Sequence, residues 1–144
     1  DLLAWTDSAA LIATGSPFEA VRHAGRTIRI AQGNNVYVFP GVGLGAIVSK
    51  TSRITPEMFV AAAETLAKML SSTDLAEGAL FPPLTELRGI SREIGLSVAR
   101  TAISQGYAAD VSEGELERRM DHSMWWPEYP VIELEEEPPT GVPD

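Results

Sequence analysis

Two adjacent carboxamides are the side chains of this 144-residue sequence whose chemistry is best suited to ligand recognition. They are Asn34 and Asn35, in the run Gln32-Gly33-Asn34-Asn35. A carboxamide donates and accepts hydrogen bonds without carrying charge, so the pair suits a small polar anion or an amide-bearing cofactor. The alternative, which composition alone favours, is an Asx turn before a strand.

A glycine cluster offers a second chemistry. Gly41, Gly43 and Gly45, followed by Ala46, fit a loose form of the dinucleotide-binding fingerprint. Glu64 stands at about the right distance for the ribose-binding acid of that fingerprint, but it falls inside a predicted helix. Close packing of a helix against a neighbour is therefore the better interpretation of these glycines.

Histidines and acidic residues offer little for metal binding or proton transfer. His23 and His122 are far apart, and no third ligand accompanies the pair formed by Glu19 and His23. The sequence favours a packing or solvated role for both histidines. A surface of charges paired with nearby arginines accounts for the acids of a predicted short helix, Glu113, Glu115 and Glu117.

The charge is distributed unevenly along the chain. The net charge is −9, yet residues 1–110 hold nine Lys and Arg against ten Asp and Glu, whereas residues 111–144 hold two against ten. An acidic protein without a basic stripe is a poor candidate for nucleic-acid binding. No apolar run approaches the ~20 residues of a membrane span. Cysteine is absent, which excludes disulfides, thiol nucleophiles and Cys-based zinc sites.

The first third of the chain predicts short strands and turns. The apolar run at residues 9–14 predicts a buried strand of a parallel sheet, which ends in a loop at Gly15. Alternation over residues 27–30 predicts a half-exposed strand, with a turn at Ala24-Gly25 before it. The apolar residues 43–49 predict a buried helix.

Three further helices are predicted from apolar spacing and from start and stop signals. Thr55-Pro56 begins the first, because Thr can cap a helix and Pro is tolerated at its first position. Its apolar stripe is Phe59, Ala62, Ala63, Leu66, Met69 and Leu70. The stripe of the second is Leu87, Ile90, Ile94, Val98 and Ala102, with Gly106 as its stop. Ser112 and Glu115 make a capping box for the third, through Met120.

The remaining residues predict an extended arm. It contains Trp125, Trp126 and Tyr129 between prolines, and then the run Glu135-Glu136-Glu137-Pro138-Pro139. The three aromatic side chains are expected to pack on a surface, most readily that of a neighbouring subunit, while the glutamates stay solvated.

Four motifs, read in order, resemble hallmarks of the malic enzymes. They are Ala13-Thr14-Gly15-Ser16-Pro17-Phe18, the run from Gln32 to Gly45, Arg53-Ile54-Thr55-Pro56-Glu57-Met58 and Leu80-Phe81-Pro82-Pro83-Leu84. Their order over about residues 1–106 is more specific than any one of them. Beyond Ala108 the chain resembles the family only through its helix and its Trp-containing arm. The chain is thus similar to the C-terminal portion of a malic enzyme.

The resemblance implies an enzyme that oxidises L-malate with NAD or NADP and decarboxylates it to pyruvate and CO2 with a divalent metal, Mg or Mn. It implies that Asn34 and Asn35 bind the substrate, and that Asn35 binds the cofactor together with Gly15 and Ser16 of the first loop. A neutral donor beside a carboxylate would orient malate without competing with the charge of the metal.

The family's catalytic Tyr and Lys, its metal-binding carboxylates and its main dinucleotide motif have no match in this sequence. Tyr37 and Lys50 are not assigned to those roles, because their neighbours place them in the family's structural segments. No catalytic or metal-binding residue is therefore predicted here. The chain is expected to be a fragment, and to be inactive by itself.

The resemblance also implies an α/β fold: the end of a Rossmann-like parallel sheet, a mostly helical segment and an extended C-terminal arm. Residues 1–34 would be the remnant of the NAD(P)-binding domain, residues 35–109 a helical segment of the core, and residues 110–144 a C-terminal helix with an acidic arm. We expect a cytoplasmic homo-oligomer, a dimer or tetramer formed through the helices and the arm.

Two other functions stay open at this point. The malolactic relatives share the same motifs and convert malate to lactate and CO2 without net redox change. The other is a non-catalytic interaction module whose apolar helix faces and Trp-rich arm dock on another chain. A stable folded monomer without affinity for malate or NAD would favour the module.

Overall fold

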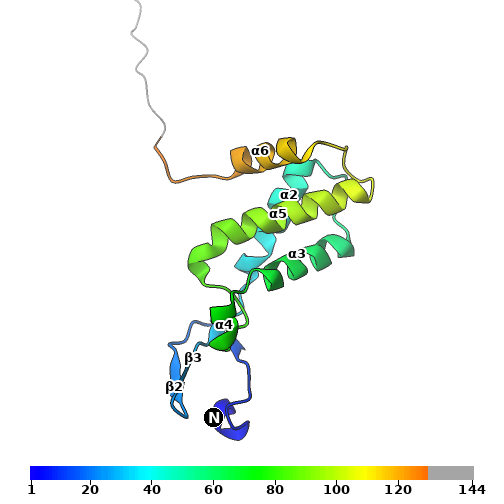
Figure 1. The fold of residues 1–144 in the computed structure, drawn as a ribbon. Helices are drawn as coiled ribbons and strands as arrows, with labels where there is room; N and C mark the ends of the chain where they lie inside the picture. Colours follow the sequence, from blue (N-terminus) through cyan, green and yellow to red (C-terminus); the bar gives the residue numbers. More distant parts are fainter. Residues whose placement is uncertain (130–144) are drawn as a thin grey trace, which may run out of the picture.

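The structure, a computed structural model, describes residues 1–129 and consists of a small strand-containing part followed by a helical part (Figure 1). In chain order the elements are α1 (Leu2–Trp5), β1 (Ala13–Thr14), β2 (Val21–His23), β3 (Arg26–Ile28), β4 (Ala31–Gln32), the 3-10 helix η1 (Asn35–Tyr37), α2 (Phe39–Ser49), α3 (Pro56–Lys68), α4 (Ser72–Ala76), the 3-10 helix η2 (Leu84–Glu86), α5 (Leu87–Ser104) and α6 (Glu113–Ser123). This mixed α/β architecture confirms the predicted fold class.

The strand-containing part holds two separate strand pairs. β1 and β4 run parallel, with Ala13 opposite Ala31 and Thr14 opposite Gln32. Between them the chain forms the antiparallel hairpin β2–β3. Its predicted turn at Ala24-Gly25 is confirmed, with φ of 47° and 74° at the two positions. The strands are shorter than predicted, because β1 takes up only the last two residues of the apolar run at 9–14.

The helical part is organised around α5, the longest helix, which contacts α2, α3 and α6 (Figure 1). One apolar cluster joins α3 and α5 with η1 and α2; its buried members are Tyr37, Val42, Met58, Ala62, Leu66, Ile90, Ile94, Val98 and Ala102. A second cluster joins α2, α5 and α6; its buried members are Val48, Leu96, Ala99, Leu116 and Met120. Because α5 has neighbours on two faces, it buries more positions than the single predicted stripe.

Glycines let α2 approach α5 closely. A Cβ built on Gly41 would lie 2.6 Å from the Ile94 side chain, and one built on Gly45 would lie 2.8 Å from that of Val98. Both glycines are buried within α2. The preferred interpretation of the cluster as a packing surface is therefore confirmed, and its reading as a phosphate loop is wrong.

Two local predictions on the helices need partial correction. In the stripe of α3, Ala62 and Leu66 are buried as predicted, but Met58 is buried in place of Phe59, which is 43 % exposed. The predicted start of α3 is confirmed, with Thr55 at the N-cap position and Pro56 as the first helical residue. The Thr55 side chain nevertheless makes no capping bond, because its hydroxyl donates to the Gln105 side-chain oxygen at 2.8 Å. The segment after α3 contains the short helix α4. Ser71 and Asp74 cap it with a reciprocal box, a signal obscured by the shortness of the helix.

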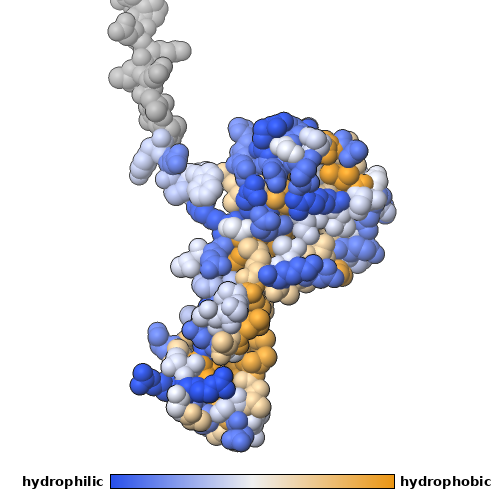
Figure 2. Space-filling model, in the orientation of Figure 1, coloured by the Kyte–Doolittle hydropathy of each residue, from blue (hydrophilic) through white to orange (hydrophobic). Residues whose placement is uncertain are grey.

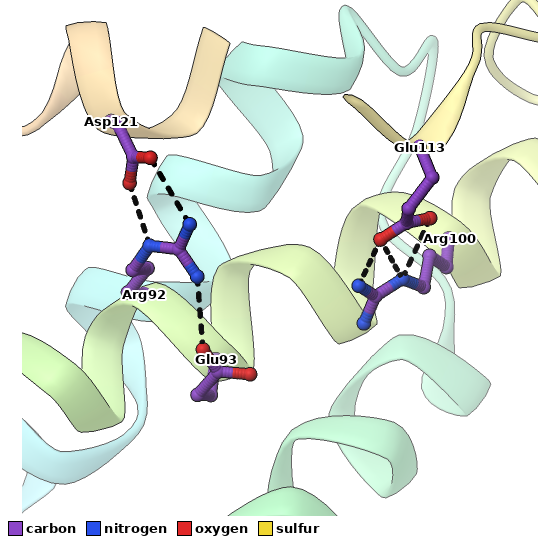
Figure 3. A network of polar contacts seen from close by, with 5 residues as sticks. All are labelled: Arg92, Glu93, Arg100, Glu113 and Asp121. Atoms are coloured by element: carbon purple, nitrogen blue, oxygen red, sulfur yellow. Dashed lines mark hydrogen bonds and ion pairs between the residues drawn. The ribbon is translucent and has the colours of Figure 1, made fainter. Parts of the chain in front are cut away.

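Ion pairs hold α6 against α5 (Figure 3). The Arg92 guanidinium donates to both Asp121 oxygens, at 2.6 and 3.1 Å, and Arg100 pairs with Glu113. The predicted capping box of α6 is half formed. Ser112 accepts from the Glu115 N–H at 3.3 Å. The Glu115 carboxylate pairs instead with arginines of its own helix, so the predicted self-paired surface is confirmed there.

The arm begins beside the start of α5. The Arg88 guanidinium lies over the indole rings of Trp125 and Trp126, at 5.7 and 4.9 Å from their centroids, and donates to the Trp125 carbonyl oxygen. Trp125 is 73 % exposed and Tyr129 fully exposed, so residues 1–129 do not bury them. The glutamate run at 135–137 lies outside the described residues. The predicted domain boundaries after residues 34 and 109 stay predictions.

Candidate functional site

The two loops predicted to bind ligand lie side by side. β1 and β4 are parallel neighbours, so the loops that follow them, residues 15–18 and 33–35, leave the same edge of the sheet. In open α/β sheets, ligands bind outside the carboxyl ends of the strands. The fold thus brings Gly15 and Ser16 next to Asn34 and Asn35, although the two motifs are separated by the β2–β3 hairpin in sequence.

Three hydrogen bonds connect or shape these loops. The Gly33 N–H donates to the Thr14 carbonyl at 2.9 Å, which extends the parallel ladder by one step. The Gln32 side-chain Nε2 donates to the Gly15 carbonyl at 3.0 Å. The Thr14 hydroxyl donates to the Ser16 carbonyl at 2.7 Å, which closes the start of its own loop. The loop of Gly15 and Ser16 is therefore tied to the strand that carries the asparagines.

The two asparagines have different local roles. Asn34 has extended φ and ψ of −126° and 137°, and its Oδ1 accepts from the Val36 N–H at 3.0 Å. This is the Asx-type turn that composition alone suggested, but it begins the 3-10 helix η1 instead of a strand. Asn35 is the first residue of η1 and is exposed. Within residues 1–129 its side chain makes no hydrogen bond, which leaves the whole carboxamide free for a ligand.

An aromatic wall supports the asparagine loop from inside. Tyr37 is 2 % exposed, its ring stacks on Phe81 at a centroid distance of 5.4 Å, and its hydroxyl donates to the Pro82 carbonyl. Burial raises the pKa of Tyr37, which keeps the hydroxyl protonated as a donor. A Cβ on Gly33 would lie 3.6 Å from the Phe81 ring. Tyr37 is therefore a structural residue, as its sequence neighbours predicted.

Two hollows flank the loops. One, of about 200 Å³, is lined by residues that include Phe18, Gln32, Tyr37 and Phe81. A larger one, of about 330 Å³, is bounded by α1, β1 and β2 and is mostly apolar, with Leu2, Phe18 and Val21 among its lining. Figure 2 shows hydrophobic residues gathered on this N-terminal part of the molecule and along its junction with the helices.

An ion-pair cluster fixes the strand-containing part to α4. The Arg29 guanidinium binds Asp74 and lies 3.5 Å from the Glu77 carboxylate. Asp74 also accepts from the N–H and hydroxyl of Ser71. Hydrogen bonds from Ser71, together with Arg29, hold the pKa of Asp74 below its usual value. With its charge balanced by two carboxylates, Arg29 acts here as a structural tie.

The other candidate residues lie away from this edge. Glu64 is exposed on α3, where it pairs with Lys68. Lys50 is exposed in a left-handed conformation at the end of α2. Within residues 1–129 no three His, Asp or Glu side chains are grouped so that they could hold a metal ion. In the same residues, no helix has the length and apolar character needed to cross a membrane.

Sequence reasoning missed Gln32 and Thr14 as parts of the site. Both precede the motif residues that were singled out, and both contribute side-chain bonds to the first loop. The Gln32 bond depends on β1 lying beside β4, whereas the Thr14 bond is local to its own loop. A polar residue at the last position of a strand, directly before a glycine loop, is the only signal the sequence offers for them.

Comparison with known proteins identifies the family. The family model described as malic enzyme, NAD binding domain, matches residues 1–103, which is most of the chain. The chain belongs to the malic enzyme family.

Relatives of this malic enzyme chain are similar over nearly its whole length. It is 42 % identical over 129 residues to an NAD-dependent malic enzyme of Aliivibrio fischeri strain ES114, and 45 % identical over the same length to one of Pseudomonas savastanoi pv. phaseolicola. Each alignment covers 90 % of this chain and 23 % of the relative. The chain thus spans about a quarter of the length of the relatives it matches.

A solved structure supports the same assignment. The crystal structure of Entamoeba histolytica malic enzyme superposes with a TM-score of 0.63 at 26 % sequence identity. The match covers 81 % of this chain and 22 % of that one. The family assignment therefore rests on both sequence and fold.

Proposed function

We propose that the chain serves in an NAD-dependent malic enzyme, where it presents the asparagine loop to the nicotinamide end of NAD and to L-malate. The observation that carries the proposal is the placement of residues 15–16 and 34–35 on one sheet edge. The relatives' names favour NAD over NADP as the cofactor, and oxidative decarboxylation over the malolactic reaction.

The residues at this edge fit such ligands chemically. Asn35 has both a donor and an acceptor free, and the amide nitrogen of Asn34 makes no hydrogen bond within residues 1–129. Neutral amides of this kind pair with a nicotinamide carboxamide or with a malate carboxylate. No atom of residues 1–129 lies within 4 Å of a Cβ built on Gly15, so among the described residues the first loop is open to a ligand. NAD, when bound, supplies the acceptor for the hydride of malate.

In this proposal the residues of this chain bind and orient NAD and malate. Asn35 donates from its Nδ2 to the ligand, and the Asn34 cap fixes the backbone from which Asn35 projects. The stacked rings of Tyr37 and Phe81 pack against the asparagine loop and limit movement of its backbone. Positioning of this type supports catalysis by holding reactants in a productive geometry. The described residues do not fit a divalent metal, so no step is assigned to Mg or Mn here.

A hybrid enzyme tests the proposal. Residues 1–129 of this chain replace the matching segment of the Aliivibrio fischeri relative, and malate-dependent NADH formation is measured. We expect turnover from the hybrid and a loss of at least about tenfold on Asn35→Ala, since a positioned donor contributes ~2 kcal/mol or more to transition-state binding. The 144-residue chain alone is expected to form no NADH, because the described residues contain no metal site.

Two results would contradict the proposal. One is a folded hybrid that binds neither NAD nor malate while the unaltered relative binds both. The other is metal-dependent turnover by the isolated chain, which would mean that it holds catalytic groups of its own.

We also propose that the enzyme is a homo-oligomer and that the arm takes part in its contacts. Exposure of Trp125, Trp126 and Tyr129 supports this, since aromatic side chains are enriched in the centres of protein interfaces. The measurement is the number of subunits per particle, from the mass in solution, with and without residues 123–144. An unchanged number of subunits would contradict a role of the arm in assembly.

A further inference from the structure

We propose that Gln32 is a positioning residue that holds the Gly15–Ser16 loop in register with the asparagine loop, and thereby sets the affinity for the dinucleotide. This inference rests on the proposed function. Its basis is the bond from Gln32 Nε2 to the Gly15 carbonyl, at 3.0 Å between residues seventeen apart in sequence.

The backbone alone leaves the first loop weakly held. The last backbone bond of the β1–β4 ladder joins the Gly33 N–H to the Thr14 carbonyl, one residue before the loop begins. In the part of the chain that the structure describes, no atom lies within 4 Å of a Cβ placed on Gly15, and residues 15–18 are exposed. Packing from the described residues therefore does little to fix this loop, and side-chain hydrogen bonds must do so.

Gln32 and Thr14 act on successive carbonyls of the loop. Gln32 reaches across from β4 to the carbonyl of Gly15, while the Thr14 hydroxyl binds the carbonyl of Ser16 at 2.7 Å. The two donors come from the directly paired residues of the parallel register. Together they form a clasp, defined here as Thr14, Gln32 and the two carbonyls that they bind.

The clasp orients the loop toward a ligand. With both carbonyl oxygens engaged, the loop's conformation is fixed before a ligand arrives, which reduces the ordering cost of binding. Gln32 stands two residues before Asn34. The strand that leads into the asparagine loop therefore also fixes the position of the Gly15–Ser16 loop relative to the asparagines. Loss of the clasp should weaken NAD binding more than it slows the chemical step.

Variants of the hybrid enzyme test this role. Gln32→Met keeps the length of the side chain and removes its N–H donor. Loss of one hydrogen bond corresponds to a rise of roughly threefold to tenfold in the KM for NAD, with kcat within about twofold of the parent. Thr14→Val should act in the same direction, and Thr14→Ser, which keeps the hydroxyl, should restore the parent KM.

Thr101→Val is the matched control. It removes an equivalent hydroxyl-to-carbonyl bond, from Thr101 to Ser97 at 2.9 Å, on α5 and away from the sheet edge. We expect it to leave the KM for NAD unchanged. A KM for NAD that is unchanged in Gln32→Met would overturn the proposal, as would an equal rise in the Thr101→Val control.

A measurement on the 144-residue chain separates failure of the clasp from failure of the proposed function. Amide hydrogen exchange over residues 15–18 is compared between the parent and Gln32→Met, without any ligand. We expect faster exchange in the variant, confined to that loop. If the hybrid proves inactive but exchange rises as expected, the clasp stands and the proposed function fails. If exchange is unchanged, the clasp itself is refuted.

Discussion

Gly45 faces the backbone of Gly95 so closely that a Cβ on Gly45 would lie 2.5 Å from the Gly95 carbonyl oxygen. A carbonyl of the facing helix cannot move aside as a flexible side chain can. Gly45→Ala is therefore expected to destabilise the chain by about 1–3 kcal/mol, as overpacked core substitutions do. Gly43→Ala is the control, because nothing lies within 4 Å of its Cβ. It should gain roughly 0.5–1 kcal/mol from helix propensity. Urea denaturation measures both, and equal stabilities would contradict the close approach of α2 and α5.

The two asparagines should respond differently to substitution. Asn34→Ala removes the cap on the Val36 N–H and should cost ~1 kcal/mol of stability. Asn34→Asp keeps an accepting oxygen, so it should retain that stability while losing the amide donor. Asn35→Ala should leave the melting temperature unchanged and lower turnover in the hybrid enzyme. A variant at Asn35 with normal kinetics and a lowered melting temperature would make it a turn residue only.

Substitution of Gly15 tests whether the cofactor contacts the first loop. The chain has room for a methyl group at this position, so Gly15→Ala should keep the parent's melting temperature. A dinucleotide that contacts the loop would meet that methyl group, and the KM for NAD should then rise by about tenfold, which corresponds to ~1.4 kcal/mol. Gly89→Ala on α5, which is equally open, is the comparison for effects unrelated to ligand. An identical KM in both variants would place the cofactor away from this loop.

Acid should weaken the tie between the strand-containing part and α4. The pKa of Asp74 is lowered in the folded chain by hydrogen bonds from Ser71 and by Arg29. The unfolded chain therefore binds more protons below the ordinary Asp value of ~3.9, and the stability due to Asp74 is present above that value and lost as pH falls toward the folded pKa. In urea titrations at a series of pH values, Asp74→Asn should remove this loss of unfolding free energy at acid pH, and Ser71→Ala should reduce it. If both variants lost unfolding free energy at acid pH as steeply as the parent does, Asp74 would not be the group responsible.

Arg88 should hold the arm on the molecule. Arg88→Ala removes the contacts of the guanidinium with both indoles and its bond to the Trp125 carbonyl, an exposed set that contributes ~0.5–1 kcal/mol. The expected result is faster proteolysis near residue 125 and a changed tryptophan emission, with helix content unchanged. Arg118→Ala on the exposed face of α6 is the control. The same cleavage rate in both variants would show that Arg88 does not retain the arm.

Sequence pattern predicted the helices better than the strands. The stripe of α5 and its stop at Gly106 were correct because a long helix repeats its apolar spacing over many turns, and Gly106 takes a φ of 75°. β1 and β4 have two residues each, which is too few to show an alternation of polar and apolar side chains in the sequence. α4, with five residues, is also too short to show a repeated apolar spacing, and it is marked instead by the hydrogen bonds of Ser71 and Asp74.

The candidate site was predictable only as separate motifs. The sequence singled out Asn34, Asn35, Gly15 and Ser16, but their proximity follows from the parallel pairing of β1 with β4, whose paired residues are eighteen positions apart in the chain. Gln32 and Thr14 gained significance only once that pairing was known. The sequence shows which residue types are present, but the bond from Gln32 to the first loop forms only because the strand register places Gln32 opposite Thr14.

The shortness of the β1–β4 pair has a consequence for how ligand affinity is set. Most of the fully buried side chains belong to the helical clusters, whereas the sheet edge is held by a few partly exposed hydrogen bonds. Regions of that kind open locally at a small free-energy cost while the rest of the molecule stays folded. A ligand that binds only the closed edge has its apparent affinity reduced by the closed fraction. Substitutions that never touch the ligand can then tune its binding through this opening equilibrium.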